Sequence, residues 1–588
     1  MDLFASARFD SRVDDLIKRY HIPGLAIALT HHDATACKAF GIVSDDPPVP
    51  MSADTLFDIA SASKSLTAAS VALLVADNDQ YPEVQYDAEM ATLLPEDFVM
   101  PGHDHHGVTV DDILGHRSGM ASQVALLRWN TYSFPVFRFF VASHRNDNSY
   151  LGVRAERPDD ARSVTRSLRH LDTGAPLRSK FIYCNIMYTV ATHLVEQKTG
   201  SSFADFLDDK FFAPLGMTAT NLQPARARAR GLGHLISPGY SWDRESQTYR
   251  QKFDIPDAPE AQGAGSVITS VRDYIKYVRA VMHKQAPFTE DVYAGLVRAR
   301  TIVEPDHYTD ERLLPFTSPP LYAAGWEIHH YRGYQIVVHD GGITGSSSTH
   351  FFLPELEFGG VMFGNTDTAA LVAQILKYEL IDHVLGSSSS SPDTATIANP
   401  PQPSLPSQTN WEKVLFESWY EGKFEDRDNE DVWEQMEERC VEDMRQKLLS
   451  SGSGTGTREG AGQEQQEKPL EAYLGEYWHP GWHSLHVQNA NGKLFIDCTD
   501  RSYVFTLTLV HVCDQTKYYA RYKEVTAGYG APLAIEFRFD DEAEEEGDGL
   551  AVKLGVAFDE DLDDHVWFER VRPASAVQMA IRSKEGES

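Results

Sequence analysis

The chain contains, at residues Phe57–Ser70, the stretch FDIASASKSLTAAS. Ser61 and Lys64 stand three residues apart in it, and residues Leu66–Ala76 are small and apolar on nearly every side. Such a run predicts a buried helix. Because positions three apart share a helix face, the Lys64 amine can reach the Ser61 hydroxyl. We therefore expect Ser61 at a helix N-terminus, where N–H groups and the dipole favour developing negative charge.

This pair of residues has the chemistry of an activated nucleophile. A serine hydroxyl is a weak nucleophile and needs an adjacent base. A lysine can serve as that base where desolvation or a neighbouring cation lowers its pKa. Serine and lysine are common residues, however, so the pair alone fits a capped core helix with a surface lysine equally well.

Bulk properties narrow the class of protein. The chain has 588 residues, which suggests three to four domains, and a net charge of −33, which argues against nucleic acid or an anionic membrane as partner. Its N-terminus lacks the basic and apolar segments of a secretory signal, and no stretch approaches the length of a membrane span. Five scattered cysteines without a Cys-x-x-Cys pair indicate no disulfide framework. We expect a cytoplasmic protein.

A histidine-rich run at residues 102–107, GHDHHG, invites a metal-site interpretation. Its spacing fits no standard zinc pattern, and a polar loop explains it better. The sequence therefore predicts no metal site and no cofactor.

A second polar constellation is Tyr183-Cys184-Asn185, which precedes the apolar run Tyr188–Val195. The run predicts a buried helix with Tyr183 on the loop before it. A buried phenol beside an ammonium can act as a base, and an amide can orient a substrate carbonyl or a lysine. Taken alone, the tripeptide fits a core tyrosine followed by a helix cap better.

A third constellation ends a predicted strand at residues 334–339, which we expect to pair with a strand at 321–328. It consists of His339, Asp340, Gly341 and Gly342. Glycines let a strand backbone approach a ligand closely. A free N–H here could complete an oxyanion hole with the Ser61 N–H.

The N-terminal part of the chain predicts an α+β layer. A helix at 10–20 is followed by strands at 25–30 and 36–41 and then by the Ser61 helix. Further on, Ser270 is expected to cap a helix at Val271–Met282, and Leu371–Val384 forms a last helix. We assign residues 1–385 to one catalytic domain.

Composition changes after residue 385. Residues 387–406 are rich in Ser and Pro, 411–449 form a charged helical segment, and 450–466 are rich in Gly, Ser and Glu. From 470 the pattern is one of short alternating strands, which predicts an antiparallel sheet or small barrel of about 105 residues. We expect a linker with a charged helix at 386–468, a β domain at 469–575 and a tail at 576–588.

Together, Ser61-Ala62-Ser63-Lys64, Tyr183-Cys184-Asn185 and His339-Asp340-Gly341 resemble, in this order, the motifs of the serine β-lactamase and penicillin-binding-protein family. The likeness is greatest to the class C related branch, which includes esterases, D-aminopeptidases and acyltransferases, and covers about residues 8 to 385. It implies an antiparallel sheet flanked by helices with an all-α subdomain. The C-terminal region resembles the lipocalin-like β-barrel domain that follows this catalytic domain in some family peptidases.

The resemblance also implies roles. Ser61 would be the acylated nucleophile, Lys64 its proton acceptor, and Tyr183 the acid or base that serves the leaving group. Asn185 would orient the substrate carbonyl. The remaining predicted binding residues lie on the third motif: His339, Gly341 and Gly342, the last with an oxyanion-hole amide.

One departure from the family pattern concerns substrate choice. The third motif is commonly Lys-Thr-Gly, and here it is His339-Asp340-Gly341. A histidine is mostly neutral at pH 7, so the site lacks a permanent cation for a substrate carboxylate. This favours an esterase, amidase or acyltransferase over a β-lactamase. The open alternative is that Asp340 keeps His339 protonated.

Three functions remain on the sequence. The first is a serine hydrolase that cleaves an ester or amide of a small molecule or peptide. The second is an acyltransferase of natural-product tailoring with the same acyl-enzyme, and the third is an inactive binding scaffold. Retention of Ser61, Lys64, Tyr183 and Asn185 together argues against the third. Substrate identity and oligomeric state stay open.

Overall fold

The chain is described here from a computed structural model. It covers residues 1–102, 105–121, 159–243, 246–253, 257–303, 305, 313–343, 345–388, 409–420, 431–451, 466–501, 504–524, 528–529, 532–540, 549–558, 562 and 564–572. The predicted linker at 387–406, the Gly/Ser-rich segment at 450–466 and the tail at 576–588 lie wholly or almost wholly outside these residues.

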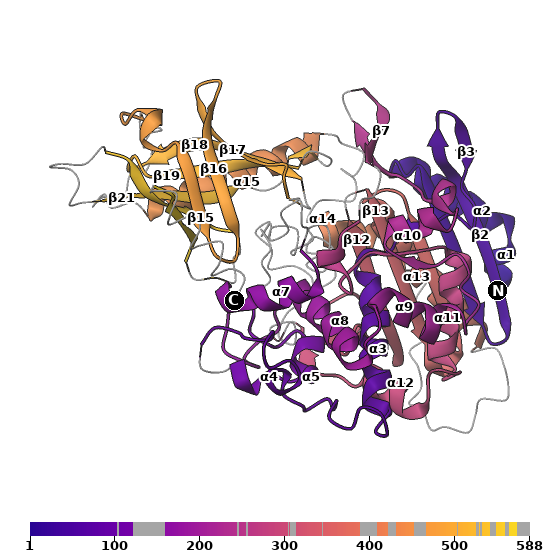
Figure 1. The fold of residues 1–588 in the computed structure, drawn as a ribbon. Helices are drawn as coiled ribbons and strands as arrows, with labels where there is room; N and C mark the ends of the chain where they lie inside the picture. The colour runs from indigo at the N-terminus through magenta and orange to yellow at the C-terminus, as the bar shows by residue number, and fades with distance from the viewer. Residues whose placement is uncertain are drawn as a thin grey trace.

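The first region is built on an antiparallel sheet of nine strands within the described residues (Figure 1). The N-terminal hairpin pairs with a strand from residues 358–364, so the two ends of this region meet in mid-sheet. In spatial order the strands are β3 (Pro48–Pro50), β2 (Ala34–Asp45), β1 (Gly24–His31), β14 (Phe358–Gly364), β13 (Ser346–Leu353), β12 (Tyr334–Ile343), β11 (Glu327–Tyr331), β10 (Leu321–Tyr322) and β9 (Thr301–Ile302).

Helices cover both faces of this sheet, and each face has its own apolar core. The back face is covered by α1 (Asp2–Ala5), α2 (Ala7–Arg19), α13 (Ala369–Ser388) and α14 (Trp411–Tyr420). The front face and the helical subdomain beside it contain α3 (Lys64–Ala76), α4 (Met90–Leu93), α5 (Val110–Leu114), α7 (Ala161–Ser167), α8 (Asn185–Thr199), α9 (Phe203–Leu207), α10 (Pro224–Ala229), α11 (Val271–Met282) and α12 (Glu290–Val297). This arrangement confirms the predicted sheet flanked by helices.

Two small sheets complete the first region. The strand before the Ser61 stretch belongs to one of them, which joins β4 (Phe57–Asp58), β8 (Val267–Thr269) and β5 (Asn221–Leu222). The other is the hairpin β6 (Gly239–Asp243) and β7 (Thr248–Phe253). The predicted cap of α11 is confirmed, because the Ser270 hydroxyl accepts from Asp273 N at 3.2 Å.

The second region is an antiparallel barrel, drawn in orange and yellow in Figure 1. Pairing of its strands β18 and β19 closes the barrel, which confirms the predicted fold. Its strands are β15 (Gly475–His479), β16 (His483–Ala490), β17 (Lys493–Cys498), β18 (Phe505–Cys513), β19 (Lys517–Glu524), β21 (Leu533–Phe539), β22 (Ala551–Val556) and β23 (Val566–Arg570), with the short β20 (Gly528–Tyr529) paired to β19.

The charged helical segment between the two regions includes two described helices, α14 and α15, which pack on different cores. Trp411 of α14 is fully buried in the back-face core of the first region. Leu448 of α15 (Asp431–Ser450) packs on the barrel with Val512 and Tyr519. The two regions touch where Gly481, in the turn between β15 and β16, lies against Leu171.

Within the described ranges, no helix is both long enough and apolar enough to cross a membrane. The same residues contain no group of three or more His, Cys, Asp or Glu side chains arranged to hold a metal ion.

Candidate active site

The Ser61 stretch forms a tight turn followed by a helix, with one difference from the prediction. Ser61 lies in a 3-10 turn at Ala60–Ser63, and the α-helix α3 begins only at Lys64. A 3-10 helix has three residues per turn, so Ser61 and Lys64 still lie above one another. Ala60 has a φ of +46°, and its N–H donates to Asp58 Oδ1 at 2.8 Å, which fixes the entry to the turn.

Lys64 is a fully buried amine that bonds to the predicted nucleophile. Its Nζ lies 2.9 Å from Ser61 Oγ and 2.9 Å from the carbonyl oxygen of Ala264. The side chain has no exposed surface, and Ser61 itself is 6% exposed. The apolar helix thus holds a titratable amine against a serine that solvent can still reach.

The second constellation lies beside this pair, as the sequence suggested. Tyr183 is on the loop before α8, 9% exposed, with its ring centroid 4.8 Å from Lys64 Nζ. Asn185 is the first residue of α8 and is buried. The geometry brings Ser61, Lys64 and Tyr183 together, while the proton transfer expected of Tyr183 stays a prediction.

A buried histidine, which the sequence analysis did not assign to the site, supports the Tyr183 loop. His116 accepts from the Cys184 N–H through Nδ1 at 3.0 Å, and its ring centroid lies 4.3 Å from that of Tyr183. Burial lowers the pKa of His116 well below its ordinary value, and Lys64 lowers it further. His116 is therefore neutral, and because Nδ1 accepts, Nε2 carries the proton.

Strand β12 carries the third motif to the nucleophile turn. A Cβ on Gly341 would lie 2.1 Å from Ile59 O, so the close approach requires glycine here. Ser348 of the neighbouring strand donates to the same carbonyl at 2.7 Å. Gly342 follows Gly341 along the strand, and its oxyanion role stays a prediction.

His339 is buried in front of β12 with both ring nitrogens bonded. Tyr322 Oη lies 3.0 Å from Nε2, and Nδ1 lies 2.6 Å from the Asp340 carbonyl oxygen. A carbonyl only accepts, so Nδ1 carries the proton and Nε2 accepts from Tyr322. Burial, with Lys64 as the next cause, lowers the pKa of His339 to about 3. The imidazole is neutral, as expected for this motif.

The alternative that Asp340 protonates His339 is wrong. Strand residues alternate between faces, and Asp340 points to the back, where its Oδ2 accepts from Gln374 of α13 at 3.0 Å. The contact of His339 is with the Asp340 main chain and not with its carboxylate.

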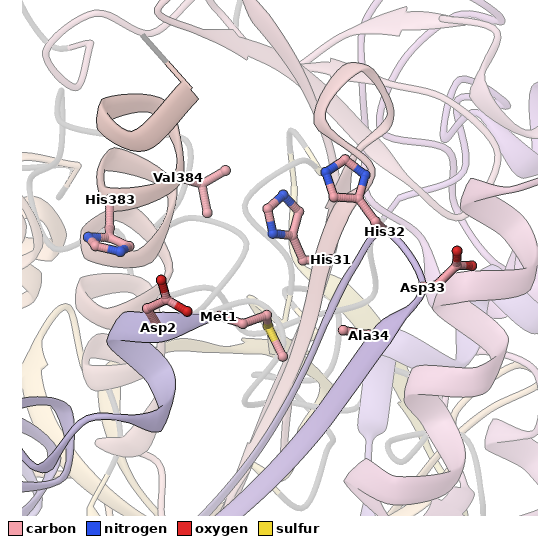
Figure 2. A pocket seen from close by; sticks show the side chains of 8 residues that line it. All are labelled: Met1, Asp2, His31, His32, Asp33, Ala34, His383 and Val384. Atoms are coloured by element: carbon pink, nitrogen blue, oxygen red, sulfur yellow. The ribbon is translucent and has the colours of Figure 1, made fainter. Parts of the chain in front are cut away.

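A pocket elsewhere on the molecule holds none of the predicted site residues. Figure 2 shows it at the β1–β2 turn and the end of α13. Its volume is about 500 Å³. It brings together three histidines but no nucleophile with an adjacent base, so we place the chemistry at Ser61 and not here. Its lining residues are Met1, Asp2, His31, His32, Asp33, Ala34, His383 and Val384.

Comparisons with known proteins agree with this fold. A family model described as Beta-lactamase matches residues 9–383, and a model described as a domain of unknown function (DUF3471) matches residues 461–570. An unguisins hydrolase of Aspergillus violaceofuscus is 30% identical over 86% of this chain and 81% of its own length. A second unguisins hydrolase, from Aspergillus campestris, is 29% identical over 96% of this chain and 91% of its own.

Among solved structures, an octameric penicillin-binding protein homologue from Pyrococcus abyssi covers 97% of this chain and 100% of its own. Its TM-score is 0.50 and its sequence identity 16%, which supports the fold alone. The fold, the paired Ser61 and Lys64 and the family match over residues 9–383 lead to one conclusion: this chain is a hydrolase that belongs to the beta-lactamase family.

Proposed function

We propose that the chain is a serine hydrolase that cleaves an uncharged ester or amide through an acyl-enzyme on Ser61. The observation that carries the proposal is the 2.9 Å hydrogen bond between Ser61 Oγ and the buried Lys64 Nζ. A base at hydrogen-bond distance from a hydroxyl is the arrangement that nucleophilic catalysis requires.

In the first step, the Ser61 hydroxyl proton moves to the unprotonated Lys64 amine while Oγ attacks the substrate carbonyl. The oxygen of that carbonyl becomes negative and is stabilised by main-chain N–H groups, for which Ser61 and Gly342 are the candidates. The C–O or C–N bond to the leaving group then breaks. Tyr183, beside Lys64, returns the proton to the leaving group.

In the second step, water attacks the acyl-enzyme. Its proton passes to the same base, and the product carboxylic acid leaves as Ser61 regains its hydrogen. No step needs a metal ion or a redox group. The chain's own residues supply a nucleophile, a base and an acid.

The substrate class follows from the third motif. His339 is neutral and both of its nitrogens are bonded within the protein, so it offers no cation to a carboxylate near the scissile bond. Binding of a neutral amide or ester does not depend on such a cation. Because two relatives are named unguisins hydrolases, unguisins are the first compounds to test.

The test is the mass of the intact protein after incubation with an activated nitrophenyl ester and, separately, with a fluorophosphonate. The wild type should gain one acyl or phosphonyl group, and Ser61→Ala should gain none. Ser70→Ala is the matched control, since Ser70 lies on the same buried segment and only donates to Leu66 O at 2.8 Å. Equal labelling of Ser61→Ala and wild type would rule the proposal out.

An added alcohol or amine acceptor extends the same measurement. If the acyl group passes to water, free acid accumulates and the protein is a hydrolase. If the ester or amide of the acceptor is formed faster than free acid, the acyl-enzyme serves transfer instead.

A further inference from the structure

The back of β12, opposite the nucleophile, carries a buried cluster of ionisable groups. Asp340 lies between His339 and Gly341 in sequence, but strand alternation turns its side chain toward α13. There Gln374 Nε2 donates to Asp340 Oδ2 at 3.0 Å. This hydrogen bond ties the strand that carries the predicted oxyanion-hole residue Gly342 to a helix on the back of the sheet.

Two more charged residues complete the cluster. Glu327 of β11 pairs with Val338, two residues before Asp340, so the two carboxylates share the back face. Lys377 of α13 lies one turn after Gln374 and is 2% exposed. The other groups that face the cluster are His329 of β11, Thr349 of β13 and Tyr378 of α13.

The charge states follow from burial. Burial raises the pKa of Glu327 well above its ordinary value, and the neighbouring Asp340 raises it further. Burial also raises the pKa of Asp340 and lowers that of Lys377, and in each case the opposite charge of the partner acts against the shift. Glu327 is accordingly the member of the cluster that most favours the protonated form, and Lys377 interacts electrostatically with Asp340.

Such a cluster is a poor way to stabilise a sheet. Removing two charges from water costs free energy that their attraction often fails to return, and apolar side chains of similar volume stabilise a core as well or better. The cluster nevertheless lies behind β12, a strand that approaches the nucleophile turn and carries the third motif. Its position suggests a role in holding that strand.

We propose that Asp340 is a positioning residue for the Ser61 reaction, and that the hydrogen bond from Gln374 and the neighbouring Lys377 hold it in place. The proposal rests on the proposed function. Asp340 acts through its main chain, since its carbonyl oxygen accepts from His339 Nδ1 while its carboxylate is fixed to α13. Asp340 therefore fixes the position of the His339 ring, which in turn bonds to Tyr322. It also fixes the backbone that leads to Gly342.

The test compares two Asp→Asn variants whose side chains both lie between the back of the sheet and α13 or α14. Asp340→Asn should lower kcat for a neutral ester by about tenfold to a hundredfold, the size expected for a misplacement of reacting groups, with KM nearly unchanged. The rate of phosphonate labelling at Ser61 should fall in parallel. Asp382→Asn is the control: Asp382 also lies on α13 and accepts from Trp411 Nε1 at 2.8 Å, but it is remote from β12 in the bonding pattern. Asp382 also accepts from Tyr331 Oη and Arg332 Nε, but no hydrogen bond among the described residues joins its side chain to β12. Asp382→Asn should lower the melting temperature and leave kcat unchanged.

The double variant Asp340→Asn with Lys377→Met covers the case in which the single variant fails to fold. It leaves no unpaired buried charge, so it should regain thermal stability while kcat stays low. Wild-type kcat in the double variant, or equal kcat in Asp340→Asn and Asp382→Asn, would overturn the positioning role. Activity that persists in Ser61→Ala would instead overturn the proposed function itself.

Discussion

Both large sheets of this chain bury aromatic rings, and they differ in the number of ionisable side chains buried beside those rings. The open sheet of the first region encloses ionisable groups on both faces: Lys64 and His339 in front, Glu327, Asp340 and Lys377 behind. The barrel encloses an aromatic centre in which the rings meet edge to face. Its fully buried members are Tyr473, Tyr477, Tyr518 and Phe537.

This difference separates a sheet built for chemistry from a sheet built for stability. Burying charge costs free energy, so a region that does it repeatedly around one strand and one serine indicates function. Burying aromatic rings stabilises a fold directly through apolar area and ring contacts. We expect changes in the first region to alter turnover and changes in the barrel to alter stability.

The largest expected effect tests the buried amine in front of the open sheet. Lys64→Met keeps the length of the side chain but removes the base, so kcat/KM for a nitrophenyl ester should fall by about 10³–10⁴. The melting temperature should hold or rise, because a buried amine is replaced by an apolar chain. Lys18→Met on the exposed side of α2 is the control. Retained turnover in Lys64→Met would place the base elsewhere.

The barrel should respond in the opposite way. Phe537→Ala removes a fully buried ring that contacts Tyr473, Tyr477 and Tyr518, and should destabilise the barrel by about 3–5 kcal/mol. Activity per labelled Ser61 should not change. Phe539→Ala, at a half-buried position of the same strand, should cost less. The measurements are urea unfolding and ester turnover normalised to phosphonate-titrated sites. Loss of turnover without loss of stability would break the comparison.

A neutral His339 should set the preference among substrates. A lysine at this place would attract a carboxylate 4 Å away by ~1–4 kcal/mol, depending on the effective dielectric. A cephalosporin should therefore have a kcat/KM lower than a short nitrophenyl ester by roughly tenfold to a thousandfold.

Since the pKa of His339 is about 3, the ratio of kcat/KM for the cephalosporin to kcat/KM for the nitrophenyl ester should not change from pH 5.5 to 8.5. The same assay distinguishes a charged imidazole. A ratio that shifts toward the cephalosporin as the pH falls would mean that His339 gains a proton in this range.

The smallest expected effect concerns Asp58 at the nucleophile turn. Burial raises the pKa of this carboxyl from 3.8 to about 6, so between these values the folded state binds more protons than the unfolded state and stability falls as pH rises. Asp58→Asn removes the titration but keeps an acceptor for the Ala60 N–H. The variant should gain about 2 kcal/mol over wild type between pH 4.5 and 7, and almost nothing above pH 7. Parallel stability curves would contradict this.

Much of the fold could be predicted because its signals are local. The Ser270 cap and the amphipathic run after it predicted both ends of α11 correctly. The three-residue spacing of Ser61 and Lys64 predicted their contact, even though the turn is a 3-10 turn and not an α-helix. The β-barrel followed from short alternating strands.

The contacts around the site could not be predicted in the same way. His116, Tyr322 and Ala264 reach it from distant segments, and only the folded chain brings them to the Lys64 and His339 side chains. The open alternative that Asp340 protonates His339 could be rejected only from the structure, because a residue next to His339 in sequence lies on the other face of the strand. Adjacent side chains in a strand point to opposite faces of the sheet, so neighbours in a sequence motif need not lie in the same site.

The helix α14 has a practical consequence for anyone who wishes to produce the catalytic half alone. The family match ends at residue 383, yet Trp411 inserts behind the sheet, where it stacks on Tyr378 at 4.3 Å, and Glu412 accepts from Arg12 and Arg19 of α2. A fragment cut at the end of the match would leave a bare apolar strip and would separate the Arg19 guanidinium from Glu412, although Arg12 would keep Glu379. We expect such a fragment to aggregate. A fragment that extends through Tyr420 keeps α14 over the back-face core, and it is the shorter fragment to produce as a soluble enzyme.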